Sequence, residues 1–167
     1  FVGGNLDVLG GASYRNGESG FAIVEADEYD RSFLTLKPNV IIINNIELDH
    51  VDIYKNESIL LKSFADFATK IKPNGTFIIN WDDSNIRKLF KSSKKKNILK
   101  YGIKSTGLVS KLRNENFKTE YNYKNKKISL NVLGEHNVYN ALAAITASGV
   151  VCDDSKRIIK SKELKDD

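Results

Sequence analysis

The chain has 167 residues, of which 41% are hydrophobic and 28% charged, and its formal net charge at pH 7 is +5. This length and composition are typical of one globular domain with a core of its own, and they exclude a disordered tail. No apolar run approaches the roughly 20 residues that span a bilayer, and the only cysteine, Cys152, has no partner for an internal disulfide. We therefore expect a cytoplasmic protein without a membrane partner.

The charge is divided unevenly along the chain. Residues 1–86 carry a net charge of −6 and residues 87–167 a net charge of +11, with lysine runs at 94–96 and 124–127. A basic surface of this kind can bind nucleic acid. However, arginine is scarce there and no known RNA-binding motif is present, so we favour a solvated lysine-rich face and expect no nucleic-acid partner.

The first third of the chain predicts two buried strands. Glycine pairs at 3–4 and 10–11 form loops but no P-loop, because no Gly-Lys-Ser/Thr follows them. The continuous apolar runs 21–24 and 40–43 are typical of parallel strands that are covered on both faces. A short helical turn over 31–36 separates the two runs, and Pro38 ends it. The chain starts at Phe1 and contains no methionine, so we expect it to be part of a longer protein.

The middle of the chain continues the alternation of helices and strands. Apolar residues at helical spacing predict a helix over 57–71, followed by a strand over 76–80. Asp83 or Ser84 can cap a helix that runs through Phe90, and residues 98–102 form another strand candidate. This alternation predicts an α/β fold with a largely parallel sheet flanked by helices.

The last third departs from this alternation. Two short strands, 121–123 and 128–130, flank a turn at 124–127 and predict an antiparallel hairpin, which is a small β excursion on the α/β body. An alanine-rich helix is expected over 138–148. The polar remainder, 153–167, is expected to form a separate amphipathic helix.

Polar residues follow both apolar runs of the first third. Glu25 opens an acidic cluster directly after the first run, and His50 lies a few residues after the second. Because the carboxyl ends of neighbouring parallel strands meet at one edge of the sheet, we expect Glu25 and His50 to face one site. A carboxylate and an imidazole can hold a divalent cation. Equally, the histidine can hydrogen-bond among the carboxylates, and the spacing alone leaves both interpretations open.

Five segments in order carry a family resemblance that spans nearly the whole chain. They resemble the central domain of the Mur ligases, and within that family they are most like the branch that joins L-alanine to UDP-N-acetylmuramate. The segments are residues 1–5, 25–34, 45–52, 75–83 and 134–144, the last reading Gly-Glu-His-Asn-Val-Tyr-Asn-Ala-Leu-Ala-Ala.

The resemblance implies an ATP-dependent amide-bond ligase of peptidoglycan synthesis, which supports cell shape and division. ATP would phosphorylate the carboxylate of UDP-N-acetylmuramate, and the amino group of L-alanine would attack the acyl phosphate. Residues 1–167 would be part of the central ATP-binding domain. The P-loop, the N-terminal UDP-binding domain and the C-terminal domain would lie outside the chain, so we expect the chain alone to be inactive.

The resemblance also implies roles for individual residues. Glu25 and His50 would bind the Mg2+ that organises the transferred phosphate, and Asn45 would reach the substrate. Asn137 and Asn140 would lie near the adenine of ATP, with His136 beside the ring. Alternatively, Asn137 is the N-cap of the helix that follows it.

Three other functions stay open at this point. A recycling ligase that adds a tripeptide to UDP-N-acetylmuramate has similar sequence motifs to those at residues 25–30 and 49–53. A basic nucleic-acid-binding module and a metal-dependent hydrolase that does not use ATP belong to other classes.

Overall fold

The computed structural model describes residues 10–17, 20–94 and 97–163, with side chains described up to Cys152. The chain divides into two compact units, Phe1–Leu36 and Lys37–Asp167.

The first unit contains the short 3₁₀ helix η2 (Tyr29–Thr35). Asp27 starts it, because its Oδ1 accepts a hydrogen bond from the backbone N–H of Tyr29 at 2.8 Å and its carbonyl oxygen accepts from that of Phe33 at 3.2 Å. Phe33 is the buried residue of the helix. The predicted helical turn over 31–36 is thus confirmed; the 3₁₀ segment spans Tyr29–Thr35, with left-handed backbone at Asp30 and Arg31.

The predicted strand over residues 21–24 is wrong. These residues have no regular secondary structure, and the side chains of Ile23 and Val24 are 82% and 46% exposed. An apolar run forms a strand only where another strand supplies ladder hydrogen bonds and a covering layer supplies burial. In the part of the chain that the structure describes, the second apolar run pairs with residues 76–79 instead.

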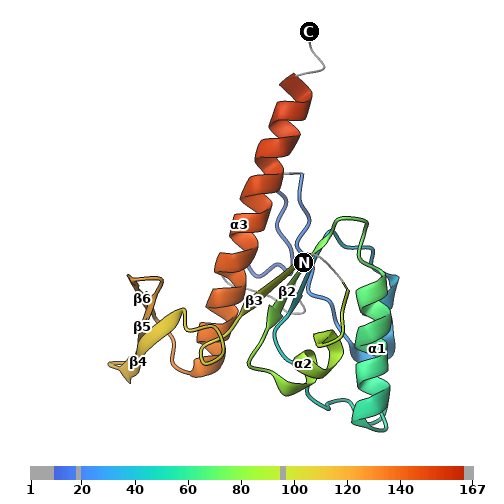
Figure 1. The fold of residues 1–167 in the computed structure, drawn as a ribbon, viewed down its shortest axis with the longest axis horizontal. Helices are drawn as coiled ribbons and strands as arrows, with labels where there is room; N and C mark the ends of the chain where they lie inside the picture. The colour runs from blue at the N-terminus through green and yellow to red at the C-terminus, as the bar shows by residue number, and fades with distance from the viewer. Residues whose placement is uncertain (1–9, 18–19, 95–96, 164–167) are drawn as a thin grey trace. The chain divides into compact units, whose positions relative to one another are not determined.

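The second unit is built on a three-stranded parallel sheet (Figure 1). Its strands are β1 (Val40–Ile43), β2 (Thr76–Asn80) and β3 (Ile98–Tyr101), in the order β1-β2-β3. The register aligns Ile42 with Ile78 and Ile78 with Leu99. All three strands were predicted, and their carboxyl ends meet at one edge, as expected for parallel strands.

Two helices cover one face of this sheet. α1 (Glu57–Thr69) is capped by Asn56, and α2 (Ser84–Phe90) is capped by Asp83, whose carboxylate accepts from Ile86 N at 2.7 Å. The ring of Phe90 meets the ring of Phe77 in β2 edge-on, with 5.2 Å between their centroids. Both helices were predicted, within two residues of their observed ends.

The long helix α3 (Glu135–Glu163) covers the opposite face. Val138 and Leu142 of α3 belong to one buried cluster with Ile78 of β2, and successive residues of a strand point to opposite faces. The expectation of two helices, over 138–148 and 153–167, is wrong, because the helix continues through Gly149 without a break (Figure 1). A glycine inside a helix costs only about 1 kcal/mol relative to alanine. Among the described helices none is both long and apolar enough to cross a membrane.

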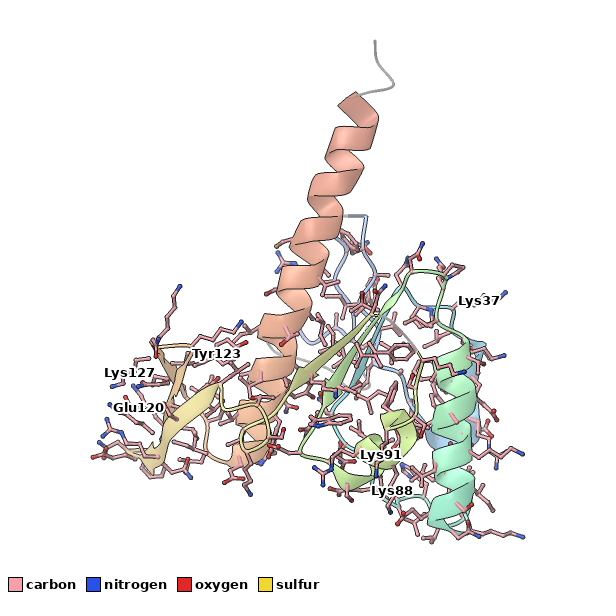
Figure 2. All side chains as sticks on the ribbon, in the orientation of Figure 1. Lys37, Lys88, Lys91, Glu120, Tyr123 and Lys127 are labelled. Atoms are coloured by element: carbon pink, nitrogen blue, oxygen red, sulfur yellow. The ribbon has the colours of Figure 1, made fainter. Side chains whose placement is uncertain are left out.

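A second, antiparallel sheet holds β4 (Val109–Glu115), β5 (Lys118–Tyr123) and β6 (Lys126–Leu130). It confirms the predicted hairpin and adds β4 to it. The two-residue turn between β5 and β6 has positive φ at Lys124 and Asn125 (46° and 67°), as type I′ turns require. Across this sheet Glu120 forms an ion pair with Arg113 at 2.6 Å and another with Lys127 at 2.9 Å. Glu120 and Lys127 are labelled in Figure 2. The expected α/β fold with a small antiparallel excursion is confirmed.

Candidate functional site

Polar side chains join the carboxyl ends of the three parallel strands. Asn44 directly follows β1, and its carbonyl oxygen accepts a hydrogen bond from the side-chain amide of Asn80, at the end of β2, at 2.9 Å. The hydroxyl of Tyr101, at the end of β3, donates to Asn44 Oδ1 at 2.6 Å. Asn44 Nδ2 in turn donates to Asn140 Oδ1 in α3 at 3.0 Å. One asparagine therefore connects three strand ends to the helix.

Tyr101 is the most deeply buried member of this group, with 2% of its surface exposed. Burial raises the pKa of its phenol, and the nearby Tyr139 and Asp83 raise the pKa further. The phenol therefore keeps its proton at neutral pH. It acts at this edge as a fixed hydrogen-bond donor.

The first two turns of α3 bring together the three residues that the resemblance associates with adenine. The side chains of His136 and Asn137 touch, with 3.0 Å between Nε2 and Nδ2, and Asn137 Nδ2 also donates to the carbonyl oxygen of Leu133 at 2.8 Å. Asn140 lies three and four residues further on, hence on the same side of the helix. The three residues therefore form one polar surface beside the strand ends.

The alternative that Asn137 is the N-cap of this helix is wrong. The helix begins at Glu135, so Asn137 lies inside the first turn. Gly134 precedes the helix with a φ of +110°, and a Cβ there would lie 2.6 Å from the His136 ring. Only glycine therefore fits where the chain enters this turn.

Asp82, after β2, is a site residue that the sequence did not single out. Its carboxylate accepts four hydrogen bonds from outside its own loop: from the backbone N–H groups of Ile103, Lys104 and Ser105 at 2.7, 2.9 and 2.8 Å, and from the Tyr139 hydroxyl at 2.9 Å. Asp82 therefore fastens the loop after β3 to α3. No local pattern marks it, because its donors lie 21 or more residues away in the sequence.

This arrangement predicts an acid-sensitive contact. Burial raises the pKa of Asp82, but the hydrogen bonds from Lys104, Ser105 and Tyr139 outweigh it and lower the pKa from 3.8 to about 2. Because the folded pKa is below the unfolded one, Asp82 stabilises the fold fully above pH 4, and this contribution is lost as the pH falls from about 4 to 2.

Urea unfolding between pH 5 and 2.5 checks this prediction. Asp82→Asn should lower stability at pH 5 and flatten the pH dependence below pH 4, and Tyr139→Phe, which removes one of the donors, should give a smaller change of the same sign. An unchanged slope in Asp82→Asn would show that the carboxylate is not held in this way.

His50 lies in the loop between β1 and α1, in a backbone conformation that few non-glycine residues adopt. Its φ is +52°. Its N–H donates to Asp49 Oδ1 at 2.7 Å, and its carbonyl oxygen accepts from the N–H groups of Ile53 and Tyr54, both at 2.8 Å. Tyr54 is completely buried. The half-buried His50 therefore sits on an anchored turn, which is the kind of strained position that clusters at functional sites.

The same loop is also fixed nearer to β1. Ile46 is 1% exposed, and its carbonyl oxygen accepts from the side-chain amide of Asn85 in α2 at 2.9 Å. Asn45, the predicted substrate-binding residue, is exposed beside it. Asn45 is therefore presented to solvent from a rigid segment.

Glu25 is exposed and belongs to the first unit, whereas His50 belongs to the second. The pairing of their side chains therefore stays a prediction. Within residues 10–17, 20–94 and 97–152, no three His, Cys, Asp or Glu side chains gather in a way that could hold a metal ion by themselves. The donor set of one carboxylate and one imidazole fits a cation that takes its other ligands from phosphate and water.

Comparison with known proteins places these features in a family. The model of the Mur ligase middle domain matches residues 12–148. The UDP-N-acetylmuramate--L-alanine ligase of Persephonella marina is 39% identical over 150 residues, which are 88% of this chain and 32% of that protein. The enzyme of the same name from Dictyoglomus turgidum is 33% identical over 169 residues, or 97% of this chain and 36% of that protein.

A solved structure is similar in fold. The UDP-N-acetylmuramate:L-alanyl-gamma-D-glutamyl-meso-diaminopimelate ligase from Neisseria meningitides superposes with a TM-score of 0.54 at 18% identity, over 69% of this chain and 36% of that one. The chain thus spans about a third of the length of the curated relatives it matches. From the match over residues 12–148 and the identity to these relatives, the chain belongs to the Mur ligase family.

Proposed function

We propose that residues 1–167 are part of the central, ATP-binding domain of a ligase that joins L-alanine to UDP-N-acetylmuramate. The observation that carries the proposal is the identity of 33–39% to ligases of that name over most of the chain. The P-loop, the UDP-binding domain and the domain that receives the amino acid would lie in the rest of the parent protein. Such a protein would work in the cytoplasm and serve cell-wall synthesis.

The proposed reaction has two steps. The carboxylate oxygen of UDP-N-acetylmuramate attacks the γ-phosphorus of ATP, the bond to the bridging oxygen breaks, and ADP leaves an acyl phosphate behind. The amino group of L-alanine then attacks the acyl carbon, loses a proton and displaces inorganic phosphate, which forms the amide. Transfer of this kind depends mainly on positioning and on fixed positive charge.

Glu25 and His50 would hold Mg2+ for this reaction. When bound, Mg2+ supplies the positive charge that offsets the charge developing on the transferred phosphoryl group. The anchored turn at His50 supports this role, because the hydrogen bonds to its backbone oxygen fix the backbone that carries the imidazole.

His136, Asn137 and Asn140 would bind the adenine of ATP. They form one polar surface on the first two turns of α3, next to the strand ends. An imidazole can lie against the base, and an amide can pair with a base edge. Asn45, exposed between the strand ends and His50, would contact the substrate.

The test uses the full-length parent protein. With ATP, Mg2+ and UDP-N-acetylmuramate, addition of L-alanine should release ADP and give a product whose mass corresponds to one added alanine. Turnover with L-alanyl-γ-D-glutamyl-meso-diaminopimelate in place of alanine would establish the recycling ligase instead.

The chain by itself is the matched control. Residues 1–167 alone should release no ADP under the same conditions. Hydrolysis without ATP, or tight and salt-sensitive binding of nucleic acid by the parent without ligation, would overturn the proposal in favour of the other two classes.

A further inference from the structure

We propose that Asn44 is a positioning residue that turns the side-chain amide of Asn140 so that its oxygen faces the sheet and its N–H donors face outward. This position would then bind a hydrogen-bond acceptor on the nucleotide base. The inference rests on the proposed function, because it takes Asn140 to lie beside the adenine of ATP. It adds a role for two residues, Asn44 and Tyr101, that touch no ligand themselves.

The series of hydrogen bonds that orients Asn140 begins at Tyr101. Its hydroxyl lies 2.6 Å from the nearer side-chain atom of Asn44 and 3.4 Å from the carbonyl oxygen of Ile43. A separation of 2.6 Å fits O–H···O and is shorter than N–H···O bonds normally are. The atom that faces the phenol is therefore the oxygen of the Asn44 amide, and the phenol donates to it.

The orientation of Asn44 follows from this contact. With Oδ1 facing Tyr101, its Nδ2 faces α3 and lies 3.0 Å from the side chain of Asn140. The backbone of Asn44 cannot turn away, because its carbonyl oxygen accepts from the buried Asn80 amide at 2.9 Å. Asn44 is thus an oriented donor held from two strands.

Asn140 must meet that donor with an acceptor. Its Oδ1 therefore points toward Asn44, and its Nδ2 with two N–H groups points the other way. Asn140 is exposed, and in the described part of the chain its side chain has this one hydrogen bond to protein. The exposed end of the amide is thus a donor, which selects a ring nitrogen of adenine over its 6-amino group.

The experiment compares ATP with 1-deaza-, 3-deaza- and 7-deaza-ATP, each of which replaces one ring acceptor by C–H. Binding to the full-length parent protein is measured by calorimetry. The wild-type protein should bind one of the three analogues about tenfold more weakly than ATP, as the loss of one hydrogen bond implies.

Asn44→Asp is the decisive variant. The aspartate has the same shape as asparagine and still accepts the hydrogen bond from the Tyr101 hydroxyl. Toward Asn140, however, it presents a carboxylate oxygen in place of the N–H donor of the wild type. Asn140 should therefore turn its amide over and present its oxygen outward. The variant should bind ATP about tenfold more weakly and should no longer distinguish ATP from the analogue that the wild type rejects.

Asn122→Asp, a change of the same kind in the small antiparallel sheet, should keep both the affinity and the discrimination. If Asn44→Asp does not fold, Tyr101→Phe replaces it and should reduce the discrimination in the same sense. Equal discrimination in the wild type and the variant, or none in the wild type, would overturn the inference. Absence of ATP binding to the wild type would instead overturn the proposed function.

Discussion

Replacement of His50 by alanine in the full-length parent protein is expected to lower kcat of the proposed ligation by about a thousandfold, with little change in overall stability. The imidazole would be one of two protein ligands of Mg2+, and the proposed reaction depends on fixed positive charge next to the transferred phosphoryl group. Steady-state release of ADP with saturating ATP, UDP-N-acetylmuramate and L-alanine measures the effect. Glu25→Gln should give a loss of similar size.

The losses in kcat caused by the two single variants should also not be additive. If Glu25 and His50 hold the same cation, the double variant should be no slower than the slower single variant, because residues that act as one unit are strongly non-additive. His136→Ala is the matched control, since it removes the other histidine of the chain and should raise the KM for ATP more than it lowers kcat. Multiplied losses in the double variant would show that Glu25 and His50 act separately.

Replacement of Phe77 by alanine should lower the free energy of unfolding by about 3–5 kcal/mol. Phe77 is 1% exposed in the central strand β2, and its ring packs edge-on against Phe90 of α2. The substitution would leave a cavity between the sheet and α2, which the surrounding elements cannot fill without moving.

Leu99→Ala is the control for this prediction. Leu99 lies on the neighbouring strand but is 40% exposed, so its truncation should cost well under half as much. Urea unfolding followed by circular dichroism measures both variants. Equal losses would mean that the packing between β2 and α2 does not dominate the stability of this sheet.

The regular elements of the second unit could be predicted because their signals are local. Helix α1 has apolar residues at helical spacing and an asparagine cap, and β1 and β2 are short apolar runs that end at polar residues. The run over 21–24 carries the same signal, yet it forms no strand. Hydrophobicity predicts that a segment tends to be buried, but it does not supply the neighbouring strand that burial needs.

The length of α3 also could not be predicted from local sequence signals. Gly149 and the polar residues after it indicate a break, but a helix already anchored by Val138 and Leu142 can extend through a single glycine. The structure therefore has one helix where the sequence predicted two.

The polar network at the strand ends could hardly be predicted from the sequence. Asp82 is held mainly by backbone N–H groups, which every residue except proline carries, and Asn44 meets partners 57 and 96 residues away. The residues of the first two turns of α3 were found only through the family resemblance. Residue type and spacing thus indicate where a site lies along the chain, whereas the contacts that orient its side chains depend on the fold.

Pulsed electron paramagnetic resonance of Mn2+ bound with ATP to the full-length parent protein measures directly whether a histidine of this chain coordinates the cation. The wild-type protein and His136→Ala should both show spin-echo modulation from a coordinated imidazole nitrogen, and His50→Ala should lose it. Glu25→Gln should keep the nitrogen signal but bind Mn2+ more weakly. A nitrogen signal that persists in His50→Ala, or that is absent from the wild type, would contradict a cation site built from Glu25 and His50.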